Sequence, residues 1–227
     1  TLVVALTTTQ VGSLSTAGVG ALTTANLAAL TTTQVGGLIA KQIAVLSTAQ
    51  VAAMTTSQVG ALSNAQVIAL TTAQVSTLNT TTLGALTTAQ VRVLEVADVA
   101  SLTTASMAAL KTTQVGGLTA TQLAGLTTAQ VAALTTTLVG VLTTTQVGSL
   151  NTAGVGALTT TNLAALTTTQ VGGLTAKQIA VLSTTQVAAM TTNQVGALSS
   201  AQVIALTTAQ VSTLNTTTLG ALTTTQV

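Results

Sequence analysis

Few side chains in this sequence could carry out chemistry. Glu95 and Asp98 lie three residues apart near the start of an expected helix, where two carboxylates could act as a pair or hold a cation weakly. Arg92 and Lys111 flank them in the sequence. A hydrolytic pair needs a shaped, desolvated environment, and the neighbouring residues provide none. We therefore interpret these four residues as a solvated patch, in which the acids favour a helix N-terminus and the bases neutralise them.

Two further patterns involve amide and hydroxyl groups. Asn-Thr-Thr at 79–81 and again at 215–217 fits the acceptor sequence for an N-linked glycan. Asn also caps helices well, so we interpret both asparagines as helix caps. The many Thr residues could form an ice-binding array, but the third Thr of the recurring motif is often Ala, as at Ala17 and Ala25.

The composition excludes most other sites. The chain of 227 residues has no Cys, His, Pro or aromatic residue, and its few charged side chains give a net charge of +2. Disulfides, thiolate metal sites and imidazole catalysis are therefore excluded, and the charge is too small for a nucleic-acid interface. Polar residues interrupt each apolar stretch before the roughly 18 residues that a membrane span requires. We expect no enzyme activity, no cofactor, no metal site, no small-molecule substrate, no nucleic-acid partner and no membrane span.

The elements that position these side chains follow an eight-residue period, which we call the octad. Val, Leu, Ile or Met stands at all 29 positions from Val3 to Val227 in steps of eight. A second series, from Leu6 to Leu222, is Leu at 26 of its 28 positions and Met at the other two. The consensus octad reads Leu, Thr, Thr, Thr or Ala, Gln, Val and two small residues. A short repeat of this kind predicts a solenoid, in which each unit is covered by its neighbours.

A longer repeat of 136 residues, or 17 octads, overlies the octads. Residues 1–91 align without gaps to 137–227 and are identical at 82 of the 91 positions. Either successive super-repeats present different faces, or the octads wind with a non-integral number per turn. In both cases the octads occupy similar environments. We expect one continuous solenoid over 1–227, a window of a longer array, with super-repeats at 1–136 and 137–227.

Each octad carries the signals of a helix start. The residue after Leu is Ser, Thr or Asn in 25 of 28 octads, and Gln follows three residues later in 19 of 28. This is a capping box, in which the hydroxyl accepts from the third backbone N–H and Gln reaches back to the N–H of the cap. The predicted capping residues include Thr7, Gln10, Thr31, Gln34, Thr127 and Gln130. The predicted core residues include Leu6, Val11, Leu14, Leu126, Val131 and Leu134.

The sequence therefore predicts an all-α solenoid with one very short capped helix per octad. A β-solenoid is the alternative, because Thr and Val favour strands. Against it, the Val and Leu series have opposite parity, so an unbroken strand would send them to opposite faces. Small residues follow Val in 24 of 28 octads, and we expect them to let neighbouring helices approach closely. One octad buries too little apolar surface to fold alone, so its stability must come from stacking on its neighbours.

The run Leu-Thr-Thr-Ala-Gln-Val-Ala-Ala-Leu at 126–134 resembles the octad arrays of giant bacterial surface proteins, which are often labelled as adhesins or haem-utilisation proteins. The resemblance extends over the whole chain and implies display outside the cell or at the cell surface. Haem use finds no support in the residues, because the chain has no His, Cys or Tyr and its three Met residues belong to the core series.

These observations favour a structural role. We expect the shaft of an extracellular filament, fibre or adhesin stalk, which associates with itself into fibres or bundles in a biofilm matrix or in cell-surface attachment. The scarcity of charge is compatible with lateral association. The alternative is a binding module for ice or carbohydrate that uses the Thr and Gln side chains.

Overall fold

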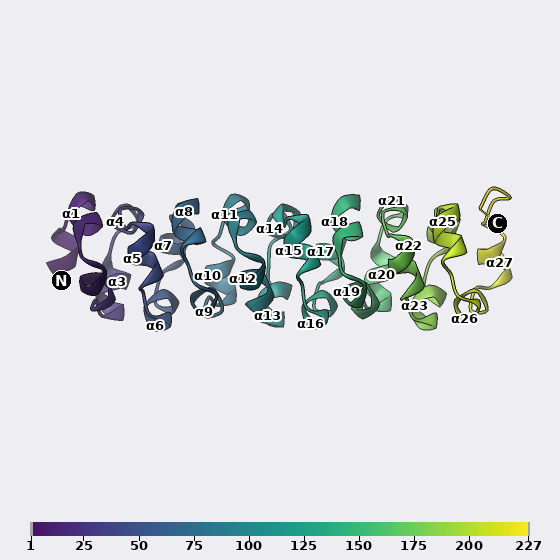
Figure 1. Ribbon diagram of the computed structural model, residues 1–227, viewed down its shortest axis with the longest axis horizontal. Coiled ribbons are helices and arrows are strands. Elements are labelled where there is room, and N and C mark those ends of the chain that lie inside the picture. Colours follow the sequence, from purple (N-terminus) through teal and green to yellow (C-terminus); the bar gives the residue numbers. More distant parts are fainter. Residues whose placement is uncertain (1, 227) are drawn as a thin grey trace. The chain divides into compact units, whose positions relative to one another are not determined.

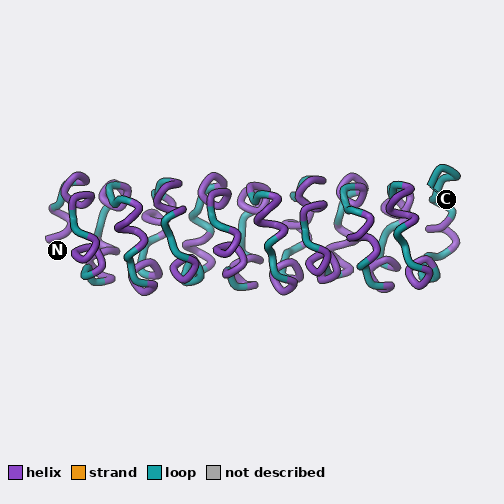
Figure 2. Tube along the Cα trace, in the orientation of Figure 1, coloured by secondary structure: helices purple, strands orange, loops and turns teal. Residues whose placement is uncertain are grey.

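The computed structural model describes residues 2–226, and all regular structure in this range is helical. Figures 1 and 2 show short helices that alternate with short loops along the chain. Within the described range no strand is present. The all-α prediction is therefore confirmed, and the β-solenoid alternative is wrong.

The described residues divide into two compact units, with the boundary between Gly117 and Leu118. This boundary differs from the end of the first sequence super-repeat at residue 136. The first unit contains η1 (Leu2–Ala5), α1 (Thr8–Ser13), α2 (Thr16–Gly20), α3 (Thr24–Ala29), α4 (Thr32–Gly36), α5 (Ala40–Ala44), α6 (Thr48–Ala52), α7 (Thr56–Gly60), α8 (Asn64–Ile68), α9 (Thr72–Val75), α10 (Thr80–Leu83), α11 (Thr88–Val93), α12 (Val96–Ser101), α13 (Thr104–Ala108) and α14 (Thr112–Gly117).

The second unit contains one helix per octad in the same way. Its helices are α15 (Ala120–Ala124), α16 (Thr128–Ala132), α17 (Thr136–Gly140), α18 (Thr144–Ser149), α19 (Thr152–Ala157), α20 (Thr160–Ala165), α21 (Thr168–Gly172), α22 (Ala176–Ala180), α23 (Thr184–Ala188), α24 (Thr192–Gly196), α25 (Ser200–Ile204), α26 (Thr208–Val211) and α27 (Thr216–Leu219).

Some helices end at the next Leu of the series and others end one or two residues before it, and the following helix begins after the next cap residue. Leu30 ends α3 with φ −62° and ψ 141°, and its N–H donates to the carbonyl of Leu27 at 3.1 Å. Thr31 then caps α4 with φ −69° and ψ 160°. Two successive extended residues therefore redirect the chain at each corner. No described residue has a positive φ, so the glycines are not needed for these turns.

The helices of each unit wind into a coil with a non-integral number of octads per turn. A helix packs on the third helix after it, as α1 does on α4 and α18 does on α21. The side chain of Gln58 on α7 reaches back to carbonyls at the end of α3, the fourth helix before it. One turn of the coil therefore takes between three and four octads. Figure 1 shows helices that are three or four apart in the sequence lying next to one another: α4, α8 and α11 follow one another along the upper edge of the first unit.

The Val and Leu series form the core of both units. Val131 is 0% exposed, and Leu126 and Leu134 are 2% and 3% exposed. Val11 is also buried, at 1%. In the first coil the result differs from the prediction, because Leu6 and Leu14 are only half-buried. Among the described residues, only the following coil packs against these two side chains, because no complete coil precedes them.

Small residues are required where two helices touch through their backbones. A Cβ atom added to Gly12 on α1 would lie 2.8 Å from the carbonyl oxygen of Gly37, which ends α4. In the second unit, a Cβ on Gly148 would lie 2.7 Å from the carbonyl oxygen of Gly173. Both distances are shorter than a van der Waals contact, so a larger residue would push the coils apart.

Candidate functional site: the glutamine ladder

The buried Gln of each consensus octad makes two kinds of hydrogen bond. Gln58 is 1% exposed, and its Oε1 accepts from the N–H of the cap residue Thr55 at 2.8 Å. Its Nε2 donates to the carbonyls of Leu27 and Leu30 at 2.9 and 2.8 Å. The first bond starts the octad's own helix, and the second ties it to the preceding coil.

The same bonds recur through both units, and we call the resulting row of side chains the glutamine ladder. In each case Nε2 donates to a backbone carbonyl 28 residues earlier, where a helix ends. Most of these Gln side chains also donate to a carbonyl 31 residues earlier. We call these bonds to the preceding coil axial bonds. They are made by Gln34, Gln42, Gln50, Gln58, Gln66, Gln74, Gln90 and Gln114 in the first unit, and by Gln146, Gln170, Gln178, Gln186, Gln194, Gln202, Gln210 and Gln226 in the second.

The axial bond explains why the capping position holds Gln and never Glu. A capping box accepts either residue, because only a side-chain oxygen is needed to bind the cap N–H. The axial bond also requires an N–H donor, which a carboxylate lacks. The position holds Gln in 19 of 28 octads and Glu in none. Capping alone does not explain the preference for Gln over Glu. This preference was the one sequence signal that could have revealed the ladder.

Where Gln is replaced, a neighbouring residue can supply the axial donor. Gly154 stands at a Gln position, and Asn151 caps that helix by accepting from its N–H at 2.7 Å. The Asn151 Nδ2 donates to the carbonyls of Ala124 and Leu126 at 2.8 and 2.9 Å. At another Gln position, Asn162 donates to the carbonyl 28 residues earlier, that of Leu134, at 2.7 Å. A shorter amide can therefore still reach the preceding coil.

Asp98 is the ladder position with an acid. It is 1% exposed, and its Oδ2 accepts from the N–H of Glu95 at 3.1 Å. Its Oδ1 accepts from the hydroxyl of Thr72 at 2.8 Å. The interpretation of this region as a solvated patch is wrong for Asp98, because the preceding coil, with Thr72, packs over this side chain. Glu95, Arg92 and Lys111 are exposed.

The predicted capping residues lie at helix starts. Thr7 and Thr31 cap α1 and α4, and each accepts from the N–H of its Gln at 3.2 Å. Gln10 is exposed and accepts from the Thr7 N–H at 2.8 Å, whereas Gln34 is 5% exposed and makes axial bonds as well. In the second unit, Thr127 and Gln130 form the capping box of α16, with bonds of 3.0 and 3.2 Å.

The asparagines of the two Asn-Thr-Thr tripeptides are also helix caps. Asn79 Oδ1 accepts from the N–H groups of Thr81 and Thr82 at 3.0 and 2.9 Å, at the start of α10. Asn215 accepts from the N–H of Thr218 at 2.9 Å, at the start of α27.

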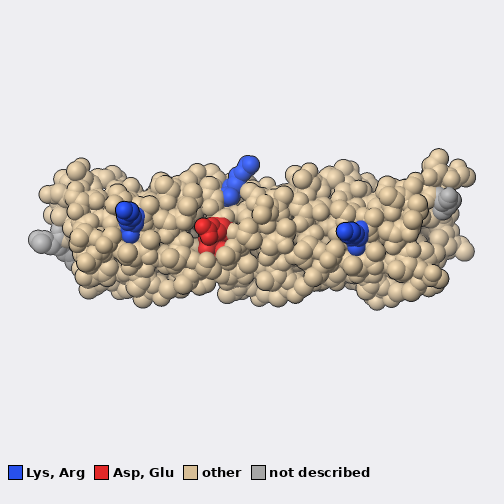
Figure 3. Space-filling model, viewed as in Figure 1, with Lys and Arg blue, Asp and Glu red and all other residues tan. Residues whose placement is uncertain are grey.

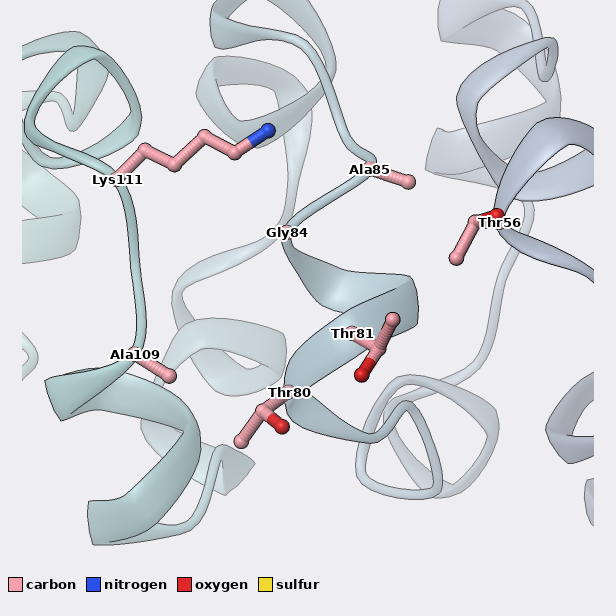
Figure 4. A pocket seen from close by; sticks show the side chains of 7 residues that line it. All are labelled: Thr56, Thr80, Thr81, Gly84, Ala85, Ala109 and Lys111. Atoms are coloured by element: carbon pink, nitrogen blue, oxygen red, sulfur yellow. The ribbon is translucent and has the colours of Figure 1, made fainter.

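A shallow hollow of about 360 Å³ lies on the first unit. Figure 4 shows the Lys111 side chain extending towards Ala85, with Thr80 and Thr81 on the neighbouring helix α10. The wall offers hydroxyl groups, methyl groups and one ammonium group, and the hollow is open to solvent. This set of groups contains no acid or base pair for catalysis. The lining residues are Thr56, Thr80, Thr81, Gly84, Ala85, Ala109 and Lys111.

The described residues contain no cluster of three or more acidic or metal-ligating side chains that could hold a metal ion. In the same range, every helix is too short, or too polar, to cross a lipid bilayer.

A comparison with protein families matches most of the chain. The model described as "ALTTAQ repeat" matches residues 3–32, 32–64, 40–72, 67–104, 91–128, 99–136, 139–168, 147–184 and 177–208. A comparison with curated proteins found no match.

Proposed function

Because this chain belongs to the ALTTAQ repeat family, we propose that its repeats serve as a structural element: the shaft of an extracellular filament, fibre or adhesin stalk. The observation that carries the proposal is the glutamine ladder. Octads with a buried Gln are bonded to the preceding coil of their unit through the same pair of atoms, so further octads of this kind extend the coil without a new kind of contact. Function then depends on length, because each added octad extends the reach of the shaft.

The core supports the same proposal. Val and Leu fill most of the interior of the coils, and Thr and Gln satisfy the backbone groups at most helix starts. These roles use all parts of the octad for stability and leave no set of side chains reserved for a substrate. The resemblance to giant bacterial surface proteins supports display of the proposed shaft outside the cell or at the cell surface.

The proposal is tested by measuring length against repeat number. Chains extended by one and two further 136-residue super-repeats would be purified and imaged by electron microscopy. We expect the contour length to rise by the same increment with each super-repeat, at constant width. A compact particle whose length does not follow the number of octads would refute the shaft.

A binding module for ice or carbohydrate is the competing function. It is favoured by exposed hydroxyls such as those of Thr8 and Thr9, which the cap bonds do not use. Thermal hysteresis by the purified chain, or retention on a glycan array, would support this alternative. A chain that lengthens with repeat number and is inactive in both assays would support the shaft alone.

A further inference from the structure

We propose that this chain pairs with a second copy of itself, antiparallel and side by side, through one stripe of side chains on the first unit. The inference rests on the proposed shaft function and names the partner of the shaft. The stripe consists of Lys41 and Val45 on α5, Ile68 on α8, Val93 at the end of α11, and Glu95 at the start of α12.

The centre of the stripe is apolar and exposed. Val45 is 45% exposed and Ile68 is 51% exposed. Most octads hold Gly, Ala or Ser at these places, so packing within the coil does not require a large side chain there. Val93, on the helix that packs on α8, is half-buried. Covering these side chains with a partner would remove apolar surface from water, which favours association.

The stripe is continuous across three packed helices. Lys41 and Val45 are four residues apart, so they lie on the same side of α5. Helix α5 packs on α8, and α8 packs on α11. The stripe therefore follows the direction in which successive coils stack.

The contact between Ile68 and Val93 follows from the repeat. These residues are 25 positions apart, as are Gly60 and Ala85 on the equivalent pair of helices. A Cβ added to Gly60 would lie 3.9 Å from the Cβ of Ala85. Ile68 and Val93 take the same two places with larger side chains, and Glu95 follows two residues later.

The two ends of the stripe carry opposite charges. Lys41 and Glu95 are both exposed, and neither side chain makes an ion pair with another described residue. Figure 3 shows how sparse charge is on one face, where a single red patch and a few blue side chains lie on an otherwise neutral surface. An antiparallel two-fold axis at Ile68 would place each Lys41 beside Glu95 of the other copy. The stripe is therefore complementary to itself.

The stripe is small, and this sets the expected strength of pairing. Stable interfaces bury about 1,200–2,000 Å² in total, far more than five side chains provide, so two single stripes pair weakly. The basic and apolar end recurs 136 residues later as Lys177, Val181 and Ile204, of which Ile204 is 81% exposed. An array in which the acidic end also recurs would pair through many stripes at equal intervals, and their combined affinity would exceed that of one. A second array supplies matching stripes at that same interval.

The test is a charge swap in the 227-residue chain, followed by sedimentation equilibrium at low salt. K41E and E95K each turn both attractive contacts of the pair into repulsion, so each should lower the association constant by about tenfold or more. The double variant K41E/E95K restores opposite charges and should recover the wild-type constant. Lys111 already occupies the cap place that corresponds to Glu95, so E95K is compatible with the fold.

Two controls separate the stripe from general effects. K111E changes the net charge as much as K41E does but lies outside the stripe, so it should leave association nearly unchanged. I68A substitutes the residue that many octads hold at this place; it should weaken pairing while the helical circular dichroism stays the same. A chain that is monomeric up to millimolar concentration, or pairing that K41E does not weaken, would refute the stripe. A monomer whose length still follows repeat number would leave the shaft intact.

Discussion

At the scale of the residue, one Gln side chain joins local and long-range structure. Its oxygen closes the helix start three residues earlier, and its nitrogen binds carbonyls 28 to 31 residues earlier. Helix ends leave carbonyls without partners inside the helix. The ladder satisfies these groups from the next coil, so the end of each helix becomes the attachment point for a later one.

Removing only the donor should therefore destabilise the coil. Q58E retains an oxygen for the Thr55 N–H but places a carboxylate against the carbonyls of Leu27 and Leu30, at a cost of about 2–4 kcal/mol. Gln10 is the matched control, because it is exposed and takes part in the bonds of its own cap. Q10E should change stability by less than about 0.5 kcal/mol.

Both variants would be compared by hydrogen exchange of the amides in the affected coils, since long repeat arrays do not unfold in one step. Equal protection in Q58E and the wild type would contradict the role of the axial bond.

Asp98 gives the reverse test. D98N would place an amide at a ladder position, where Asn162 already reaches the carbonyl 28 residues earlier at 2.7 Å. The new bond to the carbonyl of Leu70 should stabilise the coil by about 1 kcal/mol. Urea denaturation followed by circular dichroism would show a higher midpoint. A lower midpoint would mean that the bonds from Thr72 and Glu95 need the carboxylate.

At the scale of the element, the helices are too short to be stable alone. Helices α9 and α10 have four residues each, whereas isolated helices need about 12–15 residues to be marginally stable in water. Caps, core side chains and close contact with other coils must all contribute. The effect of a glycine on stability should depend on whether the backbone of a neighbouring coil lies against it, as at Gly148, or not, as at Gly140.

A pair of Gly→Ala variants separates these effects. G148A should destabilise the second unit by about 1–3 kcal/mol, because the new Cβ would lie 2.7 Å from the carbonyl oxygen of Gly173. G140A meets no atom within 4 Å and should stabilise its helix by up to about 1 kcal/mol. Thermal denaturation of the two variants should shift in opposite directions. Shifts of the same sign would show that helix propensity, and not close packing, decides the effect of these glycines.

At the scale of the whole molecule, the octads are equivalent because the coil of each unit has a non-integral number of octads per turn. A helix packs on the third helix after it, and Gln bonds reach the fourth helix before it. One turn therefore takes between three and four octads. An octad is therefore not tied to one face of the coil, and the core is filled wherever it falls. This allows a super-repeat of 17 octads, a number that neither three nor four divides.

Deleting one whole octad should therefore leave the fold intact. A chain without residues 55–62 keeps the Val and Leu series in step, so its helical content per residue should match that of the wild type. A chain without residues 55–58 puts the two series out of step and should lose about 3 kcal/mol or more from the local core. Far-UV circular dichroism and hydrogen exchange would compare the two. Equal losses in both chains would show that the octads are not interchangeable.

The sequence by itself determined the helices, because their signals are local. Thr and Gln three residues apart mark most helix starts, and the Leu and Val series mark the core without reference to any distant residue. The solvated interpretation of Asp98, in contrast, was wrong, because its burial depends on another coil. The axial bonds of Gln, the donor role of Asn151 and the number of octads per turn likewise depend on atoms about 25 to 31 residues away. Only the tertiary structure decided these features. The repeat predicts the helix that each octad forms, but it does not specify which earlier octad that helix contacts.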